Sequence, residues 1–296
     1  MVDSCGCKGV RYCAACKDSE RVRNLQTAPD DWSKPFLNYD RFVFVNGGVF
    51  RADELTVEST TAEVAACSQK IAGDSARTPD FTINGLNFLP DFITEDEEER
   101  LVRAIDNDEW LISQSGRRKT SEFTIRILFR LLVILGLGVK CERFVGVFPT
   151  TPTSSSTVWP LLDEQKFGHY EPFELCNLEY ENERQSAIEL HQDDMWIWGN
   201  RLISLNLISD SVMTFESQER NALVFVPMPR RSLLFFCDDA RYQWKHGIFP
   251  HHIEKRRIAL TMREAGVEFQ EGGELHEKFG KELLERSKRR IPKLNV

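Results

Sequence analysis

The triplet His191-Gln192-Asp193 carries two side chains that could bind one metal ion. In a β-strand, residues i and i+2 point to the same face, so His191 and Asp193 could converge on a single ion. One histidine, one carboxylate and a second histidine from a distant strand form the facial triad of non-haem Fe(II) oxygenases. The triplet alone is weak evidence, because a polar pair at the rim of an ordinary sheet has the same sequence.

The second histidine must come later in the chain. His276 lies in a predicted C-terminal helix, and His251 and His252 follow Pro250 beside a charged stretch, which is typical of a solvated turn. His246 follows an apolar run that is typical of a strand, and it has aromatic neighbours. We therefore expect His246 to complete the triad from a facing strand.

Two arginines, Arg257 and Arg263, stand on one face of the strand-like segment "RRIALTMRE". A dicarboxylate enclosed in a barrel needs a guanidinium partner, because an unpaired buried carboxylate is very costly. One arginine could bind the distal carboxylate of 2-oxoglutarate, and the other could lie near the metal-bound end. Surface arginines on an edge strand are the alternative. The order of the motifs, all within the β-rich half of the chain, favours a site.

The elements that must position these residues are short and close together. Strand-like segments separated by turns occur at Leu202–Ile208, Ala222–Val226, Ser232–Phe236 and Arg257–Met262. This spacing is typical of an all-β sandwich or barrel. Upstream, Thr94 with Glu97 forms a capping box, which predicts a helix packed against the main sheet. The sequence therefore predicts a mainly β fold with flanking helices, in the α+β class.

Four cysteines crowd into "SCGCKGVRYCAAC" near the start: Cys5, Cys7, Cys13 and Cys16. Thiolates at this sort of spacing bind zinc tetrahedrally. The C-x2-C half is common in zinc knuckles, whereas the C-x-C half is less typical. A cluster of reduced thiols on a terminal segment is the alternative to a structural zinc site.

The net charge of −8 and the pI of about 5.4 count against a protein that binds nucleic acid mainly through phosphate contacts. A local basic patch is still compatible with them. Arg117 and Arg118 belong to such a patch, which could contact a substrate, although a solvated turn would have the same composition. The longest apolar run, 131–139, is too short to span a bilayer, and no signal peptide is evident. We expect an intracellular protein, cytoplasmic and nuclear, without a membrane partner.

Taken together, the motifs H-x-D, W-K-H and R-x-A-L-T-x-R resemble the AlkB family of Fe(II)- and 2-oxoglutarate-dependent dioxygenases. Four segments resemble the branch called AlkB homologue 4, and they cover about half of the chain: "CGCKGVRYCAAC", "WLISQSGRRK", "LCNLEYENERQSAIELHQDDMWIWGNRLISLNL" and "QWKHGIFPHHIEKRRIALTMRE".

The resemblance implies a double-stranded β-helix, or jelly-roll, core in which His191, Asp193 and His246 are the iron ligands and the catalytic centre. It also implies 2-oxoglutarate binding by Arg257 at the distal carboxylate and by Arg263 near the iron-bound end. Asn177 and Tyr180 match residues that hydrogen-bond the co-substrate. The family usually has asparagine where this chain has Ala259, so one co-substrate contact is expected to be absent.

On this basis the chain divides into five parts. They are a Cys-rich segment at 1–23, a variable linker at 24–80 with one strand at Arg41–Val45, a helix and substrate-lid region at 81–170, the dioxygenase core at 171–268 and a C-terminal helix at 269–296. The lid region departs from the family, because an apolar insert at about 120–140 replaces a polar, aromatic and basic stretch. Recognition of the substrate is therefore the part of the function that this sequence leaves most open.

The implied activity is oxidative removal of N-methyl groups with release of formaldehyde, succinate and CO2. The branch is associated with methyl-lysine of a protein, actin, and with N6-methyladenine in DNA. The acidic charge favours the methylated protein, with DNA as the alternative. A non-catalytic, zinc-binding interaction protein is the hypothesis from a different class.

Overall fold

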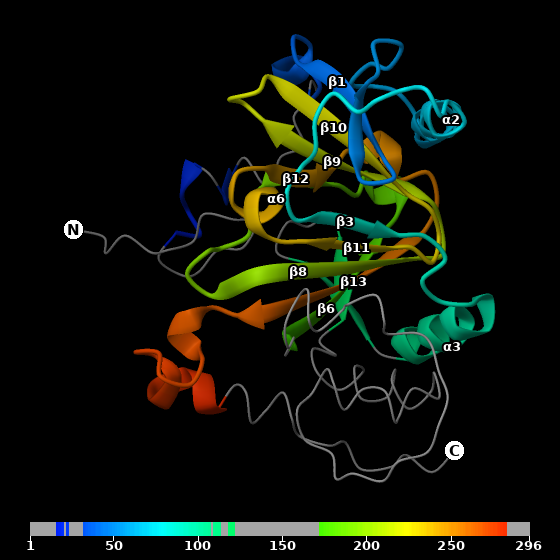
Figure 1. Cartoon of the computed structure of the whole chain (residues 1–296). Helices are drawn as coiled ribbons and strands as arrows, with labels where there is room; N and C mark the ends of the chain where they lie inside the picture. Colours follow the sequence, from blue (N-terminus) through cyan, green and yellow to red (C-terminus); the bar gives the residue numbers. More distant parts are fainter. Residues whose placement is uncertain are drawn as a thin grey trace, which may run out of the picture.

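The computed structural model describes residues 16–20, 22–23, 32–107, 109–113, 118–121 and 172–282 (Figure 1). These residues are mostly β-sheet, with few helices. No helix within these ranges has the length and apolar character needed to cross a bilayer. The predicted apolar insert lies outside the described residues, apart from its first two positions.

Two sheets face each other and enclose the main core (Figure 1). The six-stranded sheet has the order β2 (Gly48–Arg51), β1 (Asp40–Val45), β10 (Ala222–Met228), β9 (Ser211–Ser217), β12 (Lys245–Ile248) and β7 (Ile188–His191). The seven-stranded sheet has the order β3 (Leu86–Leu89), β11 (Leu233–Phe236), β8 (Trp198–Leu207), β13 (Arg257–Ala265), β6 (Pro172–Tyr180), β5 (Lys119–Ser121) and β4 (Trp110–Ile112). Apolar side chains from both sheets, among them Phe215, Val224 and Phe236, fill the space between them.

Helix α3 (Glu95–Asp106) covers the outer face of the seven-stranded sheet. Leu101 and Ile105 pack there against β8, β11 and β13. The predicted capping box is present, because the Thr94 side chain accepts from Glu97 N and the Glu97 carboxylate accepts from Thr94 N. The prediction of this helix is therefore confirmed.

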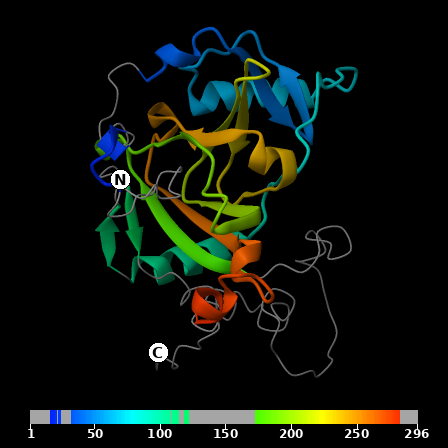
Figure 2. The ribbon, with the colours of Figure 1, turned by 90° about the vertical axis from the view of Figure 1, so that its left-hand side faces the viewer.

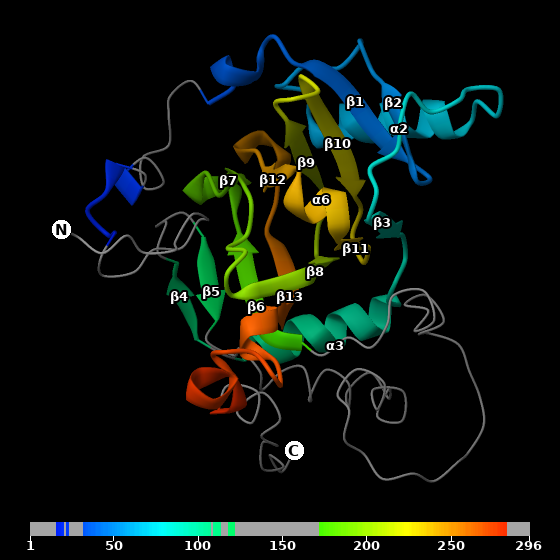
Figure 3. The same cartoon turned by 60° about the vertical axis from the view of Figure 1, so that its left-hand side comes forward.

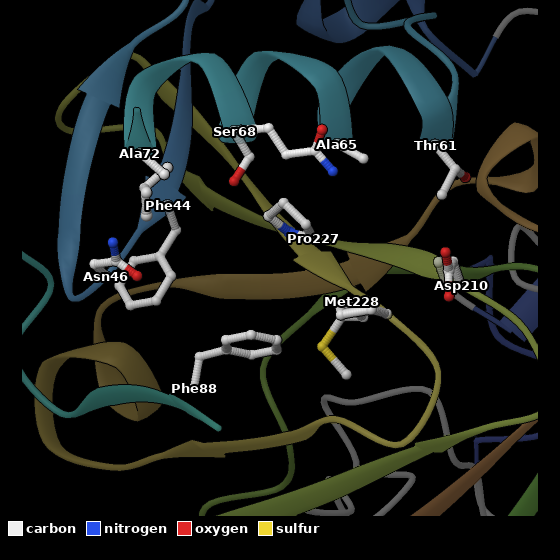
Figure 4. Close-up of a pocket in the computed structure, with 14 residues that line it drawn as sticks. Phe44, Asn46, Thr61, Ala65, Ser68, Ala72, Phe88, Asp210, Pro227 and Met228 are labelled. Atoms are coloured by element: carbon white, nitrogen blue, oxygen red, sulfur yellow. The ribbon is translucent and has the colours of Figure 1, made fainter. Parts of the chain in front are cut away.

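Helix α2 (Thr61–Ala72) covers the outer face of the six-stranded sheet, on the side of the molecule opposite α3 (Figure 2). Val64 and Ile71 bury their side chains in a cluster with residues of β1 and β10. Small side chains on α2, such as Ala65 and Ala72, leave a cleft above the end of β10 (Figure 4).

The predicted linker at 24–80 is the main correction to the fold. Its described part, residues 32–80, contains β1, β2 and α2, and β1 pairs in parallel with β10. The strand expected at Arg41–Val45 is present as β1, and the four strands predicted downstream are present as β8, β10, β11 and β13. Of the predicted C-terminal helix, residues 276–280 form one short helical segment, and 283–296 lie outside the described residues.

Candidate metal centre

Strands β7 and β12 bring the two predicted histidines together. They are antiparallel neighbours in one sheet, and His191 stands directly opposite His246. The expectation that the second histidine would come from a facing strand is therefore replaced by direct pairing. Asp193 lies just beyond the end of β7 rather than within it, so strand alternation is not what places its carboxylate.

A β-bulge in β7 sets the direction of His191. Ile248 pairs with Ile188 and His246 pairs with His191, so Glu189 and Leu190 together stand opposite Gly247. In a regular strand Ile188 and His191 would point to opposite faces, but the extra residue lets both face the space between the sheets. The bulge is therefore the local feature that turns His191 toward the site.

The three predicted ligands form a compact, buried group. One ligand atom from each of His191, Asp193 and His246 lies within 4.8 Å of the others, and each residue is 7% exposed. His246 Nε2 lies 3.6 Å from Asp193 Oδ2, and the two imidazole rings are 4.6 Å apart between centroids. His191 Nδ1 lies 2.7 Å from the carbonyl oxygen of Glu189, which leaves Nε2 of His191 for an ion.

The charges of the group suit a divalent cation. Burial lowers the pKa of His191 to about 4 and the pKa of His246 well below its usual value, so both imidazoles are neutral near pH 7. Burial acts to raise the pKa of Asp193, but Arg263 and the two histidines outweigh it, and the net shift is downward. Two neutral nitrogens and one carboxylate are the donor set that a non-haem Fe(II) ion takes. No part of this donor set has to lose a proton near neutral pH before binding.

Arg263 lies beside the metal ligands, although its donors are already engaged by protein. Its Nε donates to Asp193 Oδ1 at 3.2 Å, and its NH1 donates to Glu174 Oε2 at 2.6 Å. Burial acts to lower the pKa of Arg263, but Asp193 and Glu174 outweigh it and raise the pKa above the usual value. Arg263 is thus placed at the metal end of the cavity, as predicted, where it orients the carboxylate of Asp193.

Arg257 is placed differently, because part of its guanidinium faces the cavity without a protein acceptor. Its side chain is 0% exposed, and its Nε donates to Asn206 Oδ1 at 2.6 Å. Its NH1 and NH2 atoms have no acceptor among the described residues. Burial lowers its pKa, and the adjacent Tyr180, whose ring lies 4.9 Å away, partly opposes this shift.

The cost of burying such a group is repaid when a carboxylate pairs with it. The free fork of Arg257 and the metal ligands line the same cavity, together with Tyr180 and apolar side chains such as Leu178 and Met213. The residues present therefore fit a dicarboxylate that reaches from the metal to Arg257.

Asn177 does not fit its predicted role in binding the co-substrate. It pairs with Leu260, whose side chain packs in the cluster beneath α3, so Asn177 faces away from the cavity. Asn206, which was not predicted from the sequence, is the asparagine that contacts Arg257. Its signal was the alternation of Leu202, Ser204 and Asn206 on the inner face of β8.

Arg118 is buried at 4% exposure, so a solvated turn does not describe it. Its guanidinium carbon lies 5.9 Å from the Tyr180 ring, and its charge contributes to the lowered pKa of His191, after burial and against the opposing effect of Asp193. Arg117 lies outside the described residues, as do Cys5, Cys7 and Cys13 of the predicted zinc cluster. Substrate contact by the arginines and zinc binding by the four cysteines remain predictions.

A jelly roll whose strands gather a His-Asp-His centre and a buried arginine in one cavity defines a 2-oxoglutarate-dependent dioxygenase. No protein-family model matches the chain. It is 42% identical over 294 residues to a Caenorhabditis elegans protein named DNA N6-methyl adenine demethylase, covering 98% of this chain and 96% of that protein. It is 33% identical over 318 residues to human alpha-ketoglutarate-dependent dioxygenase alkB homolog 4, covering 96% of this chain and 93% of that protein. The chain belongs to the AlkB family of Fe(II)- and 2-oxoglutarate-dependent dioxygenases.

Proposed function

We propose that this chain oxidatively removes N-methyl groups and that its substrate is N6-methyladenine in DNA. The observation that carries the reaction class is the shared cavity, in which three buried metal ligands lie at one end and the open fork of Arg257 at the other. When bound, Fe(II) with 2-oxoglutarate and O2 supplies the oxidation of the methyl carbon, which leaves as formaldehyde while succinate and CO2 are released.

The protein's own residues hold and orient the reactants. His191, Asp193 and His246 would hold the ion, and Arg263 keeps the Asp193 carboxylate ionised and fixed in direction. The two free NH groups of Arg257 would hold the distal carboxylate of 2-oxoglutarate, with Asn206 fixing the guanidinium plane. Apolar side chains of the same cavity, such as Leu178 and Met213, would contact the methylene groups of 2-oxoglutarate.

Similarity supports DNA as the substrate. The relative that is 42% identical over nearly the whole chain is named for demethylation of N6-methyladenine in DNA. We therefore rank DNA before a methylated protein, although the net charge alone favours the protein.

Methyl-lysine of a protein such as actin remains the second candidate, because the net charge of −8 provides little general attraction for phosphate. The two substrates predict different salt dependence. Activity on DNA should fall steeply as salt rises, whereas activity on a protein side chain should respond weakly. A non-catalytic zinc-binding role would give neither activity.

The test offers both substrates in parallel. Purified protein with Fe(II), ascorbate and 2-oxoglutarate is incubated with N6-methyladenine DNA, single-stranded and duplex, or with methyl-lysine actin, and formaldehyde and succinate are measured. We expect formaldehyde from the DNA, and none from His191→Ala or Asp193→Ala. Formaldehyde from actin alone would replace the DNA proposal by the second candidate. No turnover of either substrate, and no succinate, from folded wild type would refute the enzyme proposal.

A further inference from the structure

The short helix α6 (Asp238–Tyr242) lies against the loop that carries Asp193, beside β12 and next to β8 (Figure 3). Its Arg241 is 1% exposed, although no step of the proposed reaction uses it. Arg241 NH1 donates to the carbonyl oxygen of Asp193 at 3.1 Å, NH2 to that of Asp194 at 3.5 Å and Nε to that of Gly199 at 3.4 Å. One guanidinium therefore joins the start of this loop to Gly199, the second residue of β8.

Further bonds tie both ends of the same loop to α6. Gln192 Nε2 donates to the carbonyl oxygen of Tyr242 at 2.7 Å. Asn200 and Asp238 exchange two hydrogen bonds of 2.8 Å each, one through the Asp238 side chain and one through its backbone N–H. The loop between β7 and β8 is thus attached to α6 at each end as well as through Arg241.

The position of Asp193 in the chain explains why such an attachment matters. Asp193 lies beyond the end of β7, so no strand ladder fixes its backbone, whereas His191 and His246 are held in paired strands. Arg263 orients the carboxylate of Asp193 but does not contact its main chain. Helix α6 leads within a few residues into β12, which carries His246. The contacts of Arg241 therefore connect the backbone of one ligand to the segment that holds another.

A guanidinium whose hydrogen-bond acceptors are all carbonyl oxygens is a costly way to fill buried space. Burial lowers the pKa of Arg241, and the charge of Asp193 is the largest effect that opposes this shift. A side chain of similar length without charge, such as methionine, would fill the same volume without this cost. The arginine adds two hydrogen bonds to the loop, one to the start of β8, and a positive charge near Asp193.

We propose that Arg241 is a positioning residue, which sets the Asp193 carboxylate relative to His191 and His246 by fixing the backbone of the ligand loop. The inference rests on the iron site of the proposed function. It requires that loss of Arg241 loosen the metal site more than it loosens the fold. Residues that orient metal ligands from outside the coordination sphere typically change metal affinity roughly tenfold to a hundredfold when they are removed.

The test compares Arg241→Met and Arg241→Lys with wild type in full-length protein, using Co(II) as the probe. Co(II) affinity and the visible d–d absorption bands are measured, and thermal unfolding is followed without metal. We expect Arg241→Met to weaken Co(II) binding roughly tenfold or more and to shift the bands, with partial recovery in Arg241→Lys. The matched control is Arg201→Met, which breaks the partly buried pair between Arg201 on β8 and Glu264 on β13 and should lower stability without changing the bands.

Unchanged Co(II) affinity and bands in folded Arg241→Met would overturn the proposal, because a purely structural role predicts a lower melting temperature alone. If Arg241→Met does not fold, Arg241→Lys decides: wild-type bands and affinity overturn the proposal, and altered bands support it. Failure of the iron site itself is distinguishable, because Co(II) binding would then be absent in wild type or insensitive to Asp193→Ala.

Discussion

At the scale of single residues, the two arginines of β13, Arg257 and Arg263, differ in how many of their donors the protein engages. Arg263 donates to Asp193 and Glu174, so it orients a metal ligand. Arg257 keeps two donors without a protein acceptor within the described part of the chain. Under the proposed function, the same residue type on the same face of one strand would serve the metal at Arg263 and the co-substrate at Arg257.

Replacing Arg257 by lysine should weaken 2-oxoglutarate binding without affecting the metal. Lysine keeps the charge but loses the forked pair of bonds, and charge-assisted hydrogen bonds contribute roughly 1.5–3 kcal/mol. We expect the KM for 2-oxoglutarate, measured by succinate release, to rise roughly tenfold to a hundredfold. Co(II) affinity should stay at the wild-type value.

The neighbouring Arg256 provides the control, because it faces outward and pairs with Asp106 and Glu179. Arg256→Lys should leave the KM for 2-oxoglutarate unchanged. A wild-type KM in Arg257→Lys would mean that the co-substrate does not reach this guanidinium.

Residue types and their order were sufficient to predict that His191, Asp193 and His246 come together, because few side chains supply metal ligands. The choice of Arg257 over Arg263 for the distal carboxylate came from the family resemblance, and it stays a prediction. Asn177 was wrong for a geometric reason: it lies three residues before Tyr180, and two such positions in a regular strand point to opposite faces. Arg241 could not be found from the sequence, because its role depends on which loop packs against a five-residue helix.

At the scale of elements, the β7 bulge and the glycine opposite it form one unit. A Cβ on Gly247 would lie 2.5 Å from the Ile188 carbonyl oxygen and 2.9 Å from the Glu189 carbonyl carbon. Both are backbone atoms, so a side chain here can be accommodated only if β7 moves. Because His191 takes its direction from this bulge, the space for Gly247 and the geometry of the metal ligands are coupled.

Gly247→Ala should therefore damage the metal site and the fold together. We expect the melting temperature to fall, consistent with roughly 1–3 kcal/mol of lost stability from overpacking. We also expect Co(II) affinity to fall by roughly tenfold or more, as for other losses of ligand orientation. Thermal unfolding and a Co(II) titration measure the two effects.

Gly73→Ala is the matched control, since a Cβ there meets nothing closer than 3.5 Å and the backbone is in the right-handed helical region. It should leave Co(II) binding unchanged. If Gly247→Ala binds Co(II) as tightly as wild type, the bulge does not set the direction of His191.

Helix α3 was predicted from the sequence and helix α2 was not, and the difference has a physical reason. The helix α3 combines a capping box with an apolar stripe, and both signals were visible in the sequence. The helix α2 has the same box, formed by Thr60 and Glu63, but its body is rich in alanine and its apolar periodicity is weak. The box at Thr60 was the signal that could have identified α2 within the supposed linker.

At the scale of the whole molecule, burial of neutral histidines couples folding to pH. His246 and His252 have pKa values well below the usual value, and those of His191 and His251 are lowered to about 4, in each case chiefly by burial. The expectation that His251 and His252 are solvated turn residues was wrong: His252 is fully buried, with Nε2 3.0 Å from the Ser59 carbonyl oxygen, and His251 stacks on Trp32 at 4.7 Å between centroids.

The direction in which pH changes the free energy of unfolding follows from the number of protons that each state binds. Between pH 6.5 and about 4 the unfolded chain protonates these histidines while the folded chain does not, so the unfolded state binds more protons and the free energy of unfolding falls as pH falls. Each such histidine contributes up to about 1.4 kcal/mol per pH unit in this window. Carboxylates with lowered pKa, such as Asp106, lose their contribution only as pH falls further, so measurements between pH 6.5 and 5 isolate the histidines.

Replacing His251 by phenylalanine should make stability less dependent on pH, because the ring stack with Trp32 persists while the titrating group is lost. In metal-free protein, urea unfolding at pH 6.5, 6.0, 5.5 and 5.0 should give a slope smaller by up to about 1.4 kcal/mol per pH unit than that of wild type. Trp32→Phe separates packing from titration: it should lower stability by a similar amount at every pH and keep the wild-type slope. An unchanged slope in His251→Phe would show that this imidazole titrates normally in the folded chain, and the coupling would then rest on the two metal ligands and His252.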